Sequence, residues 1–115
     1  MDKNDVKDII CNALTHYLLE LNLSCYDKTS TIKVTSECIA YLNSNPIDEQ
    51  WILNNHLVVY PACCCYHKSL DDSIKDARIS SNEKSLAKYR EEREVIIRLK
   101  MVYEKQHLDI NIPLL

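Results

Sequence analysis

The chain contains no glycine and no phenylalanine among its 115 residues, and it has a single tryptophan. Glycine serves left-handed helix caps, tight hairpins and phosphate-cradling loops. Its absence argues against a P-loop, a dinucleotide-binding fingerprint and most all-β folds. Without phenylalanine, the core must consist mainly of Leu, Ile, Val, Tyr and Cys.

The chain also has no excess of positive charge, because 14 Lys and Arg face 17 Asp and Glu, for a net charge of -3 at pH 7. No general electrostatic attraction to nucleic acid is therefore expected. Residues 1–8, MDKNDVKD, are polar and acidic, unlike a secretory signal. A chain of this length makes one small domain with one modest core.

The most apolar stretch is 51–66, WILNNHLVVYPACCCY, whose apolar residues fall on all sides of a helix. A helix without a water-facing side lies in a core or in an assembly contact, and this one is too short to span a membrane. We expect Trp51 to be a buried anchor. Pro61 removes one helical hydrogen bond, so either the helix kinks there, which we favour, or one helix ends and another begins. A strand over 56–60 is the alternative.

Helical periodicity surrounds this stretch on both sides. Residues 5–21 form the clearest amphipathic helix. The β-branched residues 31–35 could be extended, and a short helix is expected over 36–44. Asn45 followed by Pro46 predicts the start of the central helix. Further along, Ser80 resembles the first residue of a capping box, with Glu83 three positions on, and predicts a long helix to about residue 107.

The sequence thus predicts a mainly α protein: a small helical bundle over residues 1–107, with a long C-terminal helix and an extended tail at 108–115. The tail is too apolar to stay free, and its alternating pattern is that of an extended strand. We expect it to be an arm that packs on a neighbouring copy or partner, although it could equally fold back over its own bundle. The candidate partner contacts are Trp51, Leu108, Ile110, Ile112, Leu114 and Leu115.

The six cysteines are expected to be reduced thiols in an intracellular protein. The sharpest cluster is Cys63, Cys64, Cys65 and His67. A closed zinc site needs four ligands, usually in separated pairs, and no CxxC pair exists here. We therefore interpret the cysteines as small buried hydrophobes and predict no metal, no cofactor and no catalytic residue.

The charged run 90–94 mixes arginines with glutamates, so a solvated helix surface explains it better than paired catalytic carboxylates. A cysteine nucleophile would need a base and an orienting group, and nothing selects one of the four histidines for that role. The protein is therefore expected not to be an enzyme.

The layout resembles the small helical head–tail connector proteins of tailed bacteriophages. The likeness lies in an opening D-x-x-x-x-A-L helix from Asp8 to Leu14, the segment Tyr41-Leu42-Asn43, and a buried helix followed by Ala77 and a long charged helix with Tyr89. The absence of glycine and the cysteine triplet depart from the pattern. The resemblance implies a structural virion protein, made in the host cytoplasm. It would form a homo-oligomeric ring that contacts portal and tail or neck proteins, with DNA only passing through and no membrane involved.

Two other classes remain open from the residues alone. One is a small virus-encoded inhibitory or regulatory binding protein, which would be monomeric or dimeric with one cellular partner. The other is a metal-binding protein that uses the cluster from Cys63 to Cys65 with His67. Size in solution distinguishes the regulatory binding protein from a ring-forming protein. Metal content distinguishes the metal-binding protein from both.

Overall fold

A computed structural model describes residues 3–23 and 28–111, and the side chains of 5–23 and 28–105. Within these ranges the chain is almost entirely helical and contains no strand, which confirms the mainly α fold class. The helices are α1 (Lys3–Asn22), α2 (Thr29–Ser44), α3 (Glu49–Asn54), α4 (His56–Ile79) and α5 (Glu83–Asn111).

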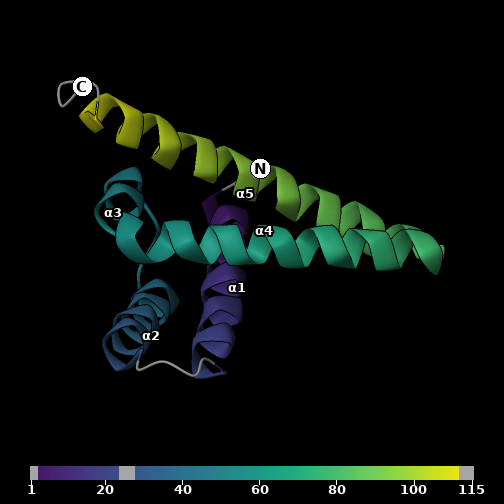
Figure 1. Ribbon diagram of the computed structural model, residues 1–115, viewed down its shortest axis with the longest axis horizontal. Coiled ribbons are helices and arrows are strands. Elements are labelled where there is room, and N and C mark those ends of the chain that lie inside the picture. The colour runs from purple at the N-terminus through teal and green to yellow at the C-terminus, as the bar shows by residue number, and fades with distance from the viewer. Residues whose placement is uncertain (1–2, 24–27, 112–115) are drawn as a thin grey trace.

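The two long helices α4 and α5 form an antiparallel hairpin that dominates the molecule (Figure 1). They lie together at the turn that joins them and diverge toward their other ends. Helix α1 crosses behind α4 in this view, with α2 beside α1, and α3 lies at the start of α4 (Figure 1). The part of the hairpin near the turn extends well beyond α1, so the molecule is elongated, measuring 47 × 32 × 32 Å.

The core lies where α1, α2 and α5 meet the first half of α4. The predicted apolar stripe of α1 is confirmed, because Ile9, Ile10, Ala13 and Leu14 are all buried. The other members of this cluster are Cys38, Leu42, Ile47, Val58, Val59, Ala62, Cys63, Leu70, Val95, Ile96, Leu99 and Tyr103. The central stretch of the sequence thus supplies core residues, as its all-round apolar character predicts.

The predicted start of the central helix at Asn45 is wrong. Asp48 is the N-cap instead, and its Oδ1 accepts a hydrogen bond from the backbone N of Trp51 at 2.7 Å. Asn45 belongs to the end of α2, where its Nδ2 donates to the carbonyl of Tyr41 at 2.9 Å. An Asn side chain that closes one helix is not free to cap the next.

The alternative that one helix ends and another begins at Pro61 is wrong, because the chain is interrupted at Asn55, between α3 and α4. Asn55 donates its Nδ2 hydrogen to the carbonyl of Trp51 at 2.8 Å and so closes α3. Helix α4 then begins at His56 and continues through Pro61 to Ile79. The carbonyl that Pro61 leaves without its helical donor is that of Leu57, an exposed residue in the first turn of α4.

The segment 31–35 is helical rather than extended, as part of α2. Thr35 is fully buried there, and its Oγ1 donates to the carbonyl of Thr31 at 2.7 Å. This local bond satisfies the buried hydroxyl, while the rest of the side chain packs in the core. The β-branched residues therefore follow the packing of α2 rather than their intrinsic preference for strands.

The turn between α4 and α5 makes the left-handed cap that usually contains glycine. Ser81 has φ 56°, its backbone N donates to the carbonyl of Arg78 at 3.2 Å, and Asn82 N donates to that of Ala77 at 2.9 Å. This pair of bonds is the Schellman motif. Asn82 then caps α5 by accepting from Ser85 N at 3.2 Å. The predicted capping box at Ser80 is therefore wrong, because Ser80 is the C-cap of α4.

The extended tail predicted for 108–115 is wrong for its first four residues, because α5 continues through Asn111. The predicted boundary after residue 107 thus falls inside a helix. Adding residues to a formed helix costs less than starting a new structure, and Pro113 disfavours helical backbone only at the residue before it. Residues 112–115 lie outside the described part of the chain.

Candidate functional site

The predicted partner contacts are only partly visible. Trp51 is half-buried rather than fully enclosed, and it stacks on Tyr41 with ring centroids 5.7 Å apart and planes 8° apart. It packs against the core from α3, a helix of only six residues that cannot cover the whole indole. The side chains of Leu108, Ile110, Ile112, Leu114 and Leu115 lie outside those that the structure describes.

The three cysteines of the triplet differ in burial. Cys63 is fully buried, and burial raises the pKa of its thiol to about 12, so it stays protonated at neutral pH. Cys64 and Cys65 are half-buried neighbours on the same helix. Among the described residues, no group of three or more His, Cys, Asp or Glu side chains is placed to hold a metal ion.

His67, the fourth member of that cluster, takes part instead in a polar network between α4 and α5. Its Nδ1 lies 3.0 Å from Lys100 Nζ, and its Nε2 lies 3.6 Å from Asp71 Oδ2. An ammonium group can only donate, so Nδ1 accepts and the neutral ring carries its hydrogen on Nε2. Burial and the positive charge of Lys100 both lower the pKa of His67. Nδ1 is thus engaged by Lys100, whereas the buried Nε2 has no hydrogen-bond partner within the described ranges.

Glu92 was expected on a solvated surface and is buried instead. Its Oε1 accepts from Asn12 Nδ2 at 3.1 Å, and its Oε2 accepts from the Tyr66 hydroxyl at 3.2 Å. Glu92 lies one helical turn before Val95 and Ile96, so it shares the core-facing side of α5. Burial and the adjacent carboxylate raise the pKa of Tyr66, which keeps its hydroxyl a donor. The three side chains join α1, α4 and α5.

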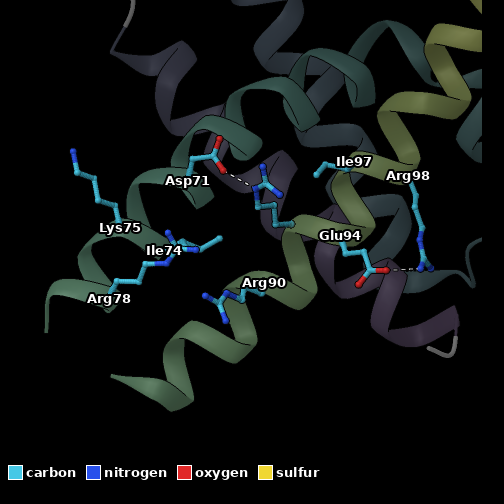
Figure 2. A pocket seen from close by; sticks show the side chains of 9 residues that line it. Asp71, Ile74, Lys75, Arg78, Arg90, Glu94, Ile97 and Arg98 are labelled. Atoms are coloured by element: carbon cyan, nitrogen blue, oxygen red, sulfur yellow. Dashed lines mark hydrogen bonds and ion pairs between the residues drawn. The ribbon is translucent and has the colours of Figure 1, made fainter. Parts of the chain in front are cut away.

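The most distinctive concave surface is a groove between α4 and α5, which we call the basic groove (Figure 2). It has a volume of about 930 Å³ and is lined by Asp71, Ile74, Lys75 and Arg78 from α4 and by Arg90, Arg93, Glu94, Ile97 and Arg98 from α5. The lining positions on each helix recur at three- and four-residue spacing, so each helix presents one continuous stripe to the groove.

Five of the nine lining side chains are cationic and two are carboxylates. Each carboxylate already pairs within the groove, Asp71 with Arg93 at 2.6 Å and Glu94 with Arg98 at 2.5 Å. The groove therefore concentrates positive charge on a protein whose net charge is -3.

The three remaining cations are Lys75, Arg78 and Arg90, and all three are exposed. They make no ion pair with any side chain in the described ranges. The guanidinium groups of Arg78 and Arg90 enter the opening from opposite helices (Figure 2). Two arginines that line one groove and have no acidic partner among the described side chains form a surface suited to an anionic ligand.

Sequence reasoning missed this groove because its two halves are 12 residues apart at their nearest points, Arg78 and Arg90, and each is interleaved with acidic residues. In a linear pattern, Asp72 and Asp76 cancel Lys75 and Arg78, and Glu91 cancels Arg90. Helical geometry turns Asp72 and Asp76 away from the groove stripe. A helical projection of residues 71–78 and 90–98 would have shown that the basic residues gather on one side of each helix and that Asp72 and Asp76 lie on another.

A second hollow of about 510 Å³ lies where α1, α2 and α5 meet. Its charges are mixed, with Asp5, Asp8 and Glu91 among the acids and Lys7 and Lys88 among the bases. Lys7 Nζ is already used, since it donates to the carbonyl of Asn45 at 3.0 Å. This hollow therefore resembles a structural junction more than a binding site.

Over 3–23 and 28–111, no helix has both the length and the apolar character required to cross a membrane. Comparison of the chain with protein-family models, characterised proteins and solved structures finds no match. The basic groove is thus the feature from which a function must be argued.

Proposed function

We propose that this protein is a non-enzymatic binding protein that associates with another macromolecule through the basic groove. The observation that carries the proposal is the convergence of Lys75, Arg78 and Arg90 on one concave surface without acidic partners among the described residues. Away from the groove, Cys63 is enclosed in the core, and His67 Nδ1 is engaged by Lys100.

The charge distribution supports association rather than stability as the role of these cations. Positive charges that lie close together on one surface repel one another, which opposes folding. A concentrated positive patch on an acidic protein attracts anionic partners and fixes their orientation. The ends of α4 and α5 beside their turn extend beyond α1 (Figure 1), and Lys75, Arg78 and Arg90 line the groove toward this turn.

The head–tail connector ring is our second candidate. Ring assembly requires contact between two unlike surfaces, which repeat head to tail until the ring closes. A basic groove on a chain of net charge -3 offers one such surface, and the acidic remainder of a neighbouring copy offers the other. In this second proposal, the ring contacts portal and tail proteins, and DNA passes through its centre.

The test combines Arg78→Glu with Arg90→Glu. A matched control combines Lys28→Glu with Lys33→Glu, two exposed residues at the start of α2 that give the same change in net charge. Complexes formed by the tagged chain in its native source are isolated and quantified. We expect the groove variant to lose the partner that the control retains, and equal retention by both variants would refute the groove as the binding site.

The ring is tested separately, by sedimentation of the purified chain and by electron microscopy of the largest species. A closed ring lost in the groove variant and kept in the control supports the second candidate. If the purified wild-type chain is a monomer and still binds its partner, the ring is excluded and the binding protein remains.

A further inference from the structure

We propose that the occupant of the basic groove is an acidic amphipathic helix of a partner protein, which packs against α4 and α5 as a third helix. This inference rests on the proposed function and specifies its partner. The apolar side of the helix would contact Ile74 and Ile97, and its carboxylates would pair with Arg78 and Arg90.

The apolar part of the groove lining, which we call its floor, consists of Ile74 and Ile97. Ile74 is only 7% exposed and Ile97 is half-buried, one on each helix of the hairpin. Cationic side chains from both α4 and α5 line the groove beside these isoleucines (Figure 2). An apolar strip between two charged walls matches a helix whose apolar residues recur every three or four positions, flanked by charged ones.

The charges also orient the occupant along the groove. The cations without acidic partners among the described residues, Lys75, Arg78 and Arg90, lie toward the turn that joins α4 and α5. Farther from the turn, the carboxylates of Asp71 and Glu94 neutralise their neighbours. The acidic end of the bound helix therefore lies nearest the turn.

The opposite end of the groove is more apolar. Met101 follows Ile97 by one helical turn on α5 and is 62% exposed, so the apolar strip continues away from the turn. From Arg90 to Met101, α5 advances about 16 Å at the helical rise per residue. The contact thus accommodates about three turns of an occupant helix, with acidic residues at the end nearest the turn between α4 and α5 and apolar ones farther from it.

The same features argue against a nucleic acid as the occupant. Single strands bind proteins through aromatic rings on which bases stack, and none of the described aromatic side chains lines the groove. Asp71 and Glu94 place carboxylates in the groove lining, where a continuous phosphate backbone would meet them. Arginine pairs well with both carboxylate and phosphate, so the apolar floor decides between them.

The experiment titrates the intact protein into three labelled probes and follows fluorescence anisotropy. The first probe is a synthetic peptide of about 16 residues, helical by design, with leucines on one face and glutamates concentrated at one end. The second has the same composition in scrambled order, and the third is an oligo-dT strand. We expect the amphipathic peptide to bind at least about tenfold more tightly than either control probe.

The double variant Arg78→Glu with Arg90→Glu should weaken binding of that peptide at least about tenfold, while Lys28→Glu with Lys33→Glu leaves it unchanged. Ile97→Glu should weaken it as well, and circular dichroism with thermal melting verifies that each variant remains folded. Arg78 and Arg90 are exposed, so the double variant has no core contact to lose.

Three results would overturn the inference: equal binding of the scrambled peptide, tighter binding of oligo-dT, or a dimer of the protein alone that only the groove variant abolishes. If native complexes depend on the groove but the peptide does not bind, the proposed function stands and this inference fails. If neither the native complexes nor peptide binding depends on the groove, the proposed function and this inference both fail.

Discussion

Ser81 has the backbone conformation for which glycine is preferred, in a chain that has no glycine. Its φ of 56° brings Cβ close to the backbone, at a cost of about 1 kcal/mol that glycine avoids. We expect Ser81→Gly to raise the free energy of unfolding by about 1 kcal/mol in urea denaturation. Ser80→Gly is the control, because Ser80 has φ -85° and its Oγ bonds to the carbonyl of Asp76. A gain from Ser80→Gly equal to that from Ser81→Gly would refute this account.

His67 should make stability fall as the solution is acidified. Burial and Lys100 lower its pKa in the folded protein below the ordinary value of 6.5, against the smaller opposite effect of Asp71. As the pH falls through this value, the unfolded chain takes up a proton on His67 before the folded chain does, so protonation favours unfolding. Arg93, paired with Asp71, acts in the same direction as Lys100.

The measurement compares urea midpoints of wild type and His67→Gln between about pH 7 and about pH 5. Carboxylates contribute to the acid dependence of both proteins, so the difference between them isolates His67. We expect a smaller loss of stability in the variant. Identical pH profiles would show that the network does not shift the pKa of His67.

At the scale of elements, the short helix α3 depends on its contacts with α2 and α5. Trp51 stacks on Tyr41 of α2, and Tyr103 of α5 donates its hydroxyl hydrogen to the carbonyl of Ile52 at 2.8 Å. Six residues cannot sustain a helix alone. The Asp48 cap and these two contacts therefore hold α3 in place.

Because Trp51 is half-buried, its removal should cost less than that of an enclosed tryptophan. We expect Trp51→Ala to lower the free energy of unfolding by about 2 kcal/mol, and Trp51→Phe by less, since a ring still stacks on Tyr41. Urea denaturation measures both. A loss above about 4 kcal/mol from Trp51→Ala would mean that the indole is enclosed, as the sequence alone predicted.

At the scale of the whole molecule, folding and assembly should be separable at the C-terminus. The last buried residue of α5 among the described side chains is Tyr103. Deleting residues 108–115 removes none of the described core, so we expect the thermal midpoint to change little. If the predicted arm contributes to assembly, the truncated chain should remain folded but sediment as a smaller species than wild type. Unfolding of the truncated chain would assign these residues to its own core.

The sequence alone was sufficient for the fold class and for much of the core. The periodicity of 5–21 and the all-round apolar stretch at 51–66 identify helices that do bury their apolar faces, because local spacing determines which side chains share a helix surface. Boundaries were harder to predict at Asn45, Asn55 and Asn82. Each of these asparagines can cap a helix start or close a helix end, and the neighbouring packing selects between the two.

Only the tertiary structure determined which charges act together. Glu92 belongs to the same charged run as Arg90, yet α1 and α4 cover Glu92 and leave Arg90 in the groove. Likewise, His67 was grouped with the cysteines beside it until α5 brought Lys100 within hydrogen-bonding distance. Sequence spacing specifies neighbours along one helix, whereas the pairing of α4 with α5 sets the partners of a charge across the helix interface. The basic groove exists only through that pairing.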